Sequence, residues 1–360
     1  MKEKIKILIA SHKPFKIPKG KYFTPVHAGR DIALSLSKDG KISEPDYQWM
    51  LNNTIGDNTG ENISSDNRYY SECSVLYWAW KNYNKLGNPD YIGLMHYRRH
   101  FIFNEEYFLN TPKNKWENAL GFVTELVQDE EYQSKIGLTD ENIRTACLNY
   151  DIVVSKDSKL ELLDGRNLRE DYINTISGVK VKDFDLMIDI VKNDYPKYYN
   201  EEKINGHSKS LYQMFIMRKD LFFEYCEFLF GVLFKIQSQV DFSDYSVNGR
   251  RTLGYLAEDL LSMFVWAGVN KGISEAGKED LKILKLGVSL IEFPYENIDA
   301  VLKKNAPSYL EYLFYKLKSP FLKGAAKQTN KEKYQSIRVQ RRLYKKLRSK
   351  GGQGGKCVEE

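Results

Sequence analysis

Cysteine is scarce in this 360-residue chain, and the few cysteines are not clustered. Cys73, Cys147, Cys226 and Cys357 lie far apart, and none belongs to a CxxC pair or to a Cys/His group. Zinc sites and disulfide frameworks both need patterned cysteines, so neither is indicated. We therefore expect a protein of a reducing compartment, the cytoplasm.

Long hydrophobic runs are missing as well. The most apolar segment, residues 221–236, is interrupted by Glu224 and Glu227, whereas a membrane-spanning helix needs about 18 or more consecutive apolar residues. Residues 1–6 lead directly into a short apolar segment, without the hydrophobic region and small-residue cleavage site of a secretory signal. We expect neither a transmembrane helix nor export by such a signal.

Acidic and basic residues are distributed unevenly along the chain. Residues 323–350 contain eleven Lys and Arg and a single acid, Glu332, although the whole chain has a net charge of only +6. The remaining residues are therefore slightly acidic in sum. A basic segment of this kind can bind nucleic acid or the anionic face of a membrane, where each basic residue contributes about 1 kcal/mol. Composition does not separate the two.

Short apolar segments alternate with helical patterns, which is typical of an α/β fold. The predicted strands are residues 5–11, 91–95, 151–155 and 214–217, and the predicted helices are residues 67–82, a helix from Thr139, 221–239 and 252–268. Asp66 or Asn67 is the expected N-cap of the first of these helices. We predict one α/β domain over residues 1–318 with a mixed, mainly parallel sheet flanked by helices. A basic helical tail over 319–350 and a disordered end over 351–360 follow it.

Polar residues follow the first two predicted strands. Ser11, His12 and Lys13 come after the first strand, and His96-Tyr97-Arg98-Arg99 comes after the second. Ligands of open α/β sheets bind at these strand ends, and arginine side chains can bind diphosphate oxygens in a bidentate manner. Together with Asp66 and Asn67, the Ser11–Lys13 turn is a candidate seat for ribose and phosphate. The alternative is that these are ordinary turn, cap and surface residues.

Two adjacent carboxylates, Glu258 and Asp259, lie on the predicted helix 252–268 among apolar residues. A carboxylate beside an apolar wall has a raised pKa, which suits a general base. Glu258 is our first candidate and Asp259 the second. The alternative is a structural ion pair with Arg250 or Arg251.

Several of these segments resemble a family of bacterial capsular and exopolysaccharide glycosyltransferases that is catalogued as a domain of unknown function. The resemblance extends from about residue 5 to residue 265, and its most specific element is the His-Tyr-Arg-Arg motif with the Trp-x-Trp helix. The segments that carry it are GENIS (60–64), YWAWK (77–81), YIGLMHYRRHF (91–101), MFIM (214–217) and GYLAE (254–258). The sequence departs from the family at Met95, where related sequences often have Cys, and at His100, where they often have Tyr.

The resemblance implies a GT-A-like glycosyltransferase fold and transfer of a hexose from a UDP-sugar to a growing repeat unit carried on polyprenyl diphosphate. Some relatives are associated with galactofuranose, so UDP-galactofuranose is the implied donor. Many such enzymes hold a divalent metal through an Asp-x-Asp pair after an apolar strand, but here His96, Arg98 and Arg99 stand at that place. We therefore expect metal-independent transfer without a cofactor, with the diphosphate held by His96, Tyr97, Arg98 and Arg99. The candidate base Glu258 favours inversion over retention.

The basic tail interleaves Tyr334, Ile337, Tyr344 and Leu347 with its charges. This pattern favours an amphipathic helix on an anionic membrane surface, and a solvated charged helix is the alternative. We expect a peripheral protein at the inner face of the cell membrane, with no nucleic-acid partner. Two other functions stay open, namely a noncatalytic scaffold of the polysaccharide assembly complex and, less favoured, a nucleic-acid-binding protein using tyrosines as stacking platforms.

Overall fold

The computed structural model describes residues 3–36, 41–269 and 281–294, and the statements below concern these residues. Residues 1–125 and 130–291 form one compact unit, and residues 126–129 belong with 292–360 to a second. The predicted boundary at residue 318, the tail over 319–350 and the end over 351–360 lie outside the described residues. None of the helices in the described part is long and apolar enough to span a membrane.

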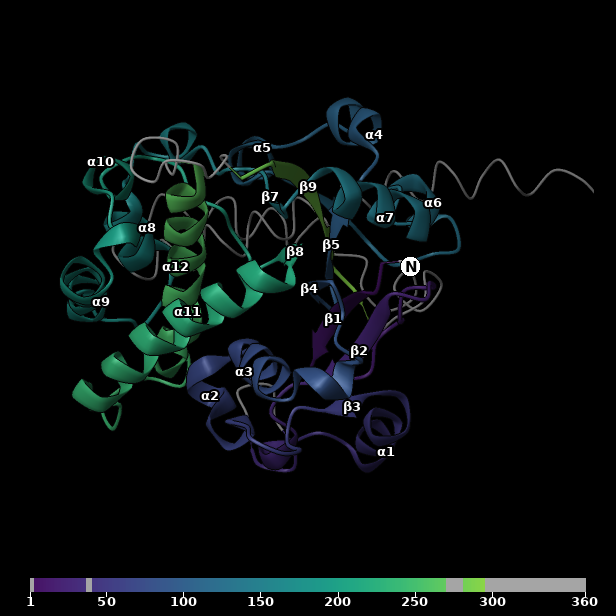
Figure 1. Cartoon of the computed structure of the whole chain (residues 1–360), viewed down its shortest axis with the longest axis horizontal. Helices are drawn as coiled ribbons and strands as arrows, with labels where there is room; N and C mark the ends of the chain where they lie inside the picture. Colours follow the sequence, from purple (N-terminus) through teal and green to yellow (C-terminus); the bar gives the residue numbers. More distant parts are fainter. Residues whose placement is uncertain (1–2, 37–40, 270–280, 295–360) are drawn as a thin grey trace, which may run out of the picture. The chain divides into compact units, whose positions relative to one another are not determined.

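The first unit contains the strands and helices of the fold (Figure 1). The strands are β1 (Ile5–Ser11), β2 (Phe23–His27), β3 (Ile55–Gly56), β4 (Tyr91–His96), β5 (Arg99–Ile102), β6 (Phe122–Glu125), β7 (Ile152–Ser155), β8 (Phe215–Arg218) and β9 (Ile283–Ile291). The α-helices are α1 (Glu44–Asn53), α2 (Asn67–Tyr70), α3 (Cys73–Lys81), α4 (Glu105–Asn110), α5 (Lys115–Leu120), α6 (Tyr132–Lys135), α7 (Asp140–Asn149), α8 (Leu168–Thr175), α9 (Val181–Asp194), α10 (Glu201–Ile204), α11 (Lys219–Gln239) and α12 (Thr252–Val269).

The sheet has a parallel part and a closed part. Strands β3, β2, β1 and β4 are parallel neighbours in that order. Strand β4 then pairs with β5 and also with β8, and the pairings β5–β9, β9–β7 and β7–β8 complete a ring of five strands. The predicted mixed sheet is confirmed, whereas the ring and its strand β9 were not predicted.

The register aligns the carboxyl ends of the parallel strands. Ala10 lies opposite His96, and Ser11 lies opposite His27, which in turn lies opposite Gly56. The loops that follow β1, β2, β3 and β4 therefore leave the sheet at one edge. This is the edge at which open α/β sheets bind ligands.

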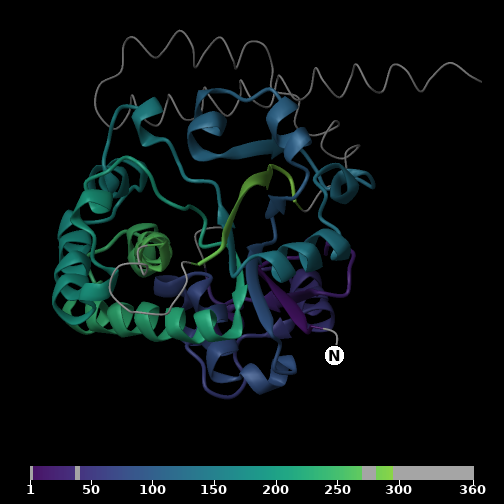
Figure 2. The same ribbon diagram turned by 45° about the horizontal axis from the view of Figure 1, so that its top comes forward.

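Both faces of the sheet are buried, as the continuous apolar run in β1 predicts. Leu8 and Ala10 face a core shared with α3, α9, α11 and α12, whereas Ile7 and Ile9 face a second core shared with α6 and α7. Helices α11 and α12 pack against each other, and Figure 2 shows α12 nearly end-on beside α11. Helix α12 is thereby held against α11, which itself contacts β4 and β8.

Most of the predicted elements are confirmed within a few residues. Thr139 is the N-cap of α7, and its side chain accepts a hydrogen bond from the Asn142 backbone amide. The predicted helix 67–82 is wrong as a single helix, because it is divided into α2 and α3 at Ser71, whose φ is 50°. Asp66 occupies the N-cap position of α2, as one of the two predicted alternatives has it, but its side chain makes no capping hydrogen bond. The side-chain amide of Asn67 instead donates to the Ser71 carbonyl and so stabilises the break.

Candidate functional site

The turn after β1 and the hairpin after β4 lie side by side at the carboxyl edge of the sheet. The Ser11 hydroxyl donates to the Lys13 carbonyl at 2.6 Å and accepts from the Lys13 amide at 3.2 Å, which closes a tight turn. The Tyr97 amide donates to the Ala10 carbonyl, and the His12 and Tyr97 rings meet edge to face with centroids 5.6 Å apart. The structure thus brings together the two polar segments that the sequence singled out.

Asp66 and Asn67 are placed beside the loop that follows β2. A Cβ on Gly29, in that loop, would lie 2.6 Å from Asn67 Cγ, and the backbone of Gly29 is left-handed (φ 67°). Only glycine fits such a close approach in this conformation. The side-chain amide of Asn67 also donates to the Ser74 hydroxyl at 2.8 Å. Asn67 therefore links the β2 loop to α3.

A buried carboxylate that the sequence did not reveal, Asp57, organises the same loops. It accepts hydrogen bonds from the backbone amides of Gly29 and Arg30 at 2.7 and 3.0 Å, and from the hydroxyls of Ser64 and Ser74 at 2.6 and 2.7 Å. Two segments far apart in the sequence are thereby fixed to one side chain. A lone Asp after a two-residue strand carries no sequence signal for this role.

His96 is buried at the end of β4. Its Nε2 lies 2.7 Å from the Tyr212 carbonyl, which can only accept, so Nε2 carries the proton. Burial, with a further contribution from the Arg99 charge, lowers the pKa of His96 to about 3. The imidazole is therefore neutral at physiological pH, and the positive charge at this site comes from the arginines.

Arg99 is a partly buried cation in need of an acceptor. Its guanidinium lies over the Tyr212 ring, with the central carbon 5.1 Å from the ring centroid. The Nε atom is buried without a hydrogen-bond partner, and among the described residues no ion pair or side-chain hydrogen bond of Arg99 is formed. Burial first, and then the neighbouring Arg98, lower its pKa. An anionic ligand would satisfy all of these donors at once.

The segment opposite Arg99 has a strained backbone. Tyr212 and Gln213 have φ values of 74° and 50°, which side-chain-bearing residues rarely adopt. The Tyr212 amide donates to the Glu258 carboxylate at 3.2 Å, and the Gln213 side chain donates to the Tyr225 hydroxyl. Surrounding contacts therefore hold an unfavourable conformation at the point where β4, α12 and this segment meet.

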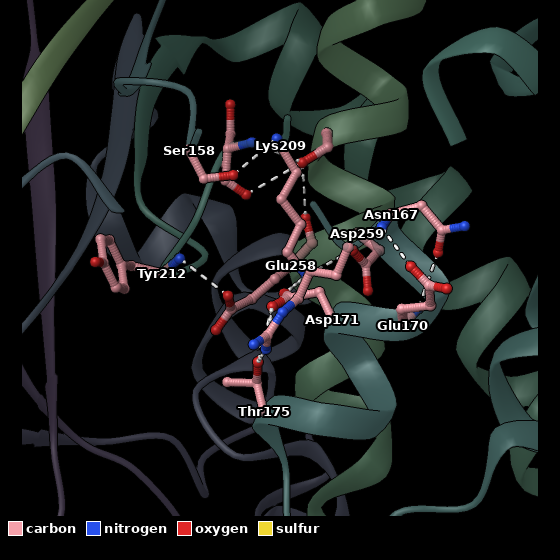
Figure 3. Close-up of polar contacts among 12 residues, drawn as sticks. Ser158, Asn167, Glu170, Asp171, Thr175, Lys209, Tyr212, Glu258 and Asp259 are labelled. Carbon is pink, nitrogen blue, oxygen red and sulfur yellow. Dashed lines mark hydrogen bonds and ion pairs between the residues drawn. The ribbon is translucent and has the colours of Figure 1, made fainter. Parts of the chain in front are cut away.

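Glu258 is the better placed of the two predicted carboxylates. It is only partly buried, and desolvation is the main cause that raises its pKa, with Lys209 opposing and Glu72 adding to the shift. Its carboxylate accepts a hydrogen bond from the Tyr212 backbone amide (Figure 3). The Arg99 guanidinium lies over the ring of the same tyrosine. A carboxylate with a raised pKa that is not fully buried suits a general base.

Asp259 belongs to a buried ion cluster instead. It is fully buried, and its Oδ1 accepts from the Lys209 ammonium at 2.9 Å (Figure 3). The same ammonium lies 3.1 Å from Asp171, which is 3.5 Å from Arg166. Burial raises the pKa of Asp259 to about 6 despite the Lys209 charge. This geometry favours a structural role for Asp259, and neither Lys209 nor Asp171 was singled out in the sequence.

The start of α12 approaches the break between α2 and α3 closely. A Cβ on Gly254 would lie 2.9 Å from the Ser71 side chain, and Arg251 donates to the Ser71 hydroxyl at 3.0 Å and to the Tyr255 hydroxyl at 3.3 Å. Glycine at position 254 therefore lets the helices meet. The next residue after the break, Glu72, was also missed by the sequence reasoning, and its Oε1 lies 3.9 Å from His96 Nε2.

Comparisons with known proteins place this geometry in context. A solved structure titled "WbbM bifunctional glycosytransferase apo structure" is similar to this chain, with 28% sequence identity and a TM-score of 0.65. The similarity covers 80% of this chain and 45% of that one, so the chain corresponds to less than half of that protein. A comparison with curated proteins finds no match. Residues 6–271 match the profile of a family described as "Domain of unknown function (DUF4422)", and since this is well over half of the sequence, the chain belongs to that family.

Proposed function

We propose that this chain is a glycosyltransferase with a GT-A-like fold, which moves a hexose from a UDP-sugar to a lipid-linked repeat unit of a capsular polysaccharide or exopolysaccharide. The similarity to the bifunctional glycosyltransferase structure supports the reaction class. The observation that carries the proposal is Arg99, a partly buried residue whose buried Nε has no hydrogen-bond partner, at the carboxyl edge of the sheet. Of the groups in a UDP-sugar, the diphosphate is the one that matches it.

The donor would lie along the carboxyl edge of β1, β2 and β4. Arg98 and Arg99 would bind the diphosphate, and the Ser11–Lys13 turn with the loop beside Asp66 and Asn67 would receive the nucleoside. Two arginines at this position can stabilise the charge of the departing UDP directly, so we propose transfer without a bound metal. Galactofuranose as the transferred sugar rests on the resemblance alone.

Glu258 is the proposed general base. It would take the proton of an acceptor hydroxyl while that oxygen forms a bond to the anomeric carbon. The bond between this carbon and the phosphate oxygen breaks, and UDP departs with the electron pair. Attack on the face opposite the departing phosphate inverts the configuration. The partly accessible Glu258 carboxylate, next to the Tyr212–Arg99 contact, supports this role over Asp259, which contacts Lys209.

The acceptor would be carried on polyprenyl diphosphate, and the basic segment 323–350 would hold the protein against an anionic membrane at the cytoplasmic side. This part of the proposal rests on the sequence, since the segment lies outside the described residues. Flotation with anionic vesicles tests it: removal of residues 323–360 should abolish co-flotation. Unchanged co-flotation would contradict it.

UDP titration calorimetry tests the donor site. Arg99→Met should weaken UDP binding by roughly 10-fold or more, because a charge-assisted contact to phosphate is lost. Arg144→Met is a matched control, since Arg144 is 41% exposed and pairs with Glu3. A transfer assay with a panel of UDP-hexoses, with and without EDTA, follows. Absence of saturable UDP binding would instead favour a noncatalytic scaffold, and activity that needs added manganese after EDTA would refute the metal-free mechanism.

A further inference from the structure

Glu72 lies at the candidate site, immediately after a break in the helical backbone. Ser71, immediately before it, has φ 50° and ψ −131°, and this conformation ends α2 and starts α3 in a new direction. The Arg251 hydrogen bond to Ser71 and the close approach of Gly254 hold the break against α12. Strain of this kind persists only where the surrounding structure fixes it, and it is often found at functional sites.

The surroundings of the Glu72 carboxylate are charged but offer it few hydrogen bonds. Its side chain is 15% exposed, and its Oε1 lies 3.9 Å from Nε2 of the neutral His96 imidazole, too far for a hydrogen bond. Burial raises its pKa, while the Arg251 and Arg99 charges oppose the rise. In the described part of the chain, no other side chain donates a hydrogen bond to it. A carboxylate that receives no hydrogen bond from another side chain keeps lone pairs for ligand hydroxyls.

The charges divide the site into two regions. Arg98 and Arg99 suit the diphosphate of a donor, whereas a carboxylate repels it and accepts hydrogen bonds from neutral hydroxyls. Glu258 and Glu72 both act electrostatically on Arg99, and the Glu72 charge contributes to the raised pKa of Glu258. The Glu72 carboxylate lies 3.9 Å from His96 Nε2, which is 2.7 Å from the Tyr212 carbonyl, and the Tyr212 amide donates to Glu258 at 3.2 Å. The two carboxylates therefore lie close to the same His96–Tyr212 contact.

We propose that Glu72 is an acceptor-binding residue that, next to Glu258, accepts a hydrogen bond from the sugar hydroxyl adjacent to the nucleophilic one. This inference rests on the proposed function. Glu258 takes the proton of the attacking hydroxyl, and Glu72 holds its neighbour, so that the pair selects a diol. Glu72 thus binds the acceptor sugar and takes no part in binding UDP.

Kinetics with simple acceptors separate these roles. The measurements are UDP affinity, hydrolysis of a UDP-hexose, and transfer to octyl β-D-galactopyranoside and octyl β-D-glucopyranoside. For Glu72→Gln, we expect UDP affinity within about 2-fold of wild type and a KM for the octyl hexoside raised about 10- to 100-fold, the size expected for a hydrogen bond to a charged group. Hydrolysis should persist in this variant. Glu72→Asp, which keeps the charge, should be less impaired than Glu72→Gln.

Monodeoxy acceptors identify the hydroxyl. Removal of the hydroxyl that Glu72 binds should raise KM in the wild type and have little further effect in Glu72→Gln. Glu227→Gln, an exposed carboxylate on α11, is the matched control and should behave as wild type. An unchanged acceptor KM in Glu72→Gln, or a change in UDP affinity instead, would overturn the proposal, because Glu72 would then only balance the arginines.

The outcome for the wild type distinguishes the two proposals. A wild-type protein that binds UDP but transfers to neither octyl hexoside also counts against the proposal that Glu72 and Glu258 bind adjacent hydroxyls of an acceptor hexose. A wild-type protein that neither binds UDP nor hydrolyses any UDP-hexose refutes the proposed function itself.

Discussion

Replacing Lys209 by Met removes the ammonium that contacts both Asp171 and Asp259 while keeping a side chain of similar length. The three side chains are 5%, 9% and 0% exposed. Breaking a buried ion pair by removing one partner costs about 3–5 kcal/mol, because the other charge stays buried. The retained Arg166 contact to Asp171 reduces the cost, whereas Asp259, whose Oδ2 already lacks a partner, increases it. We therefore expect a loss of about 3–5 kcal/mol in the free energy of unfolding.

The size of this loss should depend on pH. Burial raises the pKa of Asp259 to about 6, well above the ordinary value of an aspartate, so the folded state binds a proton more readily than the unfolded state. The stability that this proton contributes is present at low pH, and it is lost as the pH rises through the pKa that Asp259 has in the folded state. Without the Lys209 charge, the pKa of Asp259 in the folded state is higher still. The variant therefore continues to lose stability at a pH where the wild type no longer does. Urea unfolding should show a smaller deficit for Lys209→Met at about pH 5 than at about pH 8.

Two further variants make this prediction refutable. Adding Asp259→Asn to Lys209→Met removes the orphaned charge and should restore part of the stability. Lys235→Met breaks an exposed pair with Asp194 and should have a much smaller effect, since solvent screens those charges. A deficit of less than about 1 kcal/mol for Lys209→Met, or one that does not change with pH, would show that the cluster is not a buried ionic network.

Three other changes test the site. Asp57→Asn should lower the free energy of unfolding by about 1–3 kcal/mol for each donor left unsatisfied, and an unchanged urea midpoint would contradict its linking role. Glu258→Gln should reduce kcat about 100- to 10,000-fold with UDP affinity retained, and wild-type kcat/KM should rise with pH through the raised pKa of Glu258. Wild-type turnover in that variant would exclude it as the base. Gly254→Ala should displace Ser71 and raise the acceptor KM more than it weakens UDP binding; equal effects on both would argue against the two-region site.

Local patterns in the sequence were sufficient to predict the elements that have strong local signals. The apolar run Ile5–Ser11 and the Thr139 cap depend only on neighbouring residues, and both are confirmed. The sequence also placed Ser11–Lys13 and His96–Arg99 at strand ends, and the parallel register of β1 and β4 brings those ends together. The features that depend on neighbouring residues in the sequence were therefore predicted.

The remaining features depend on contacts between distant residues. The helical pattern of residues 67–82 is continuous in the sequence, and the break at Ser71 arises from contacts with Arg251 and Gly254, far along the chain. Lys209 lies in a segment without regular structure, and its partner Asp259 is 50 residues away. Residue spacing carries no signal for such contacts, so Glu72 and Lys209 were found only in three dimensions.

The ring of strands has a consequence for the folding kinetics of this chain. Strand β9 joins β5 to β7, yet it comes after α12, so 180 residues lie between the end of β5 at Ile102 and the start of β9 at Ile283. Closing such long loops must precede the gain from pairing, which makes folding slow. During synthesis, the edges of β5 and β7 would stay unpaired until residue 291 has left the ribosome, and such edges invite aggregation. The chain should therefore fold late and benefit from chaperones.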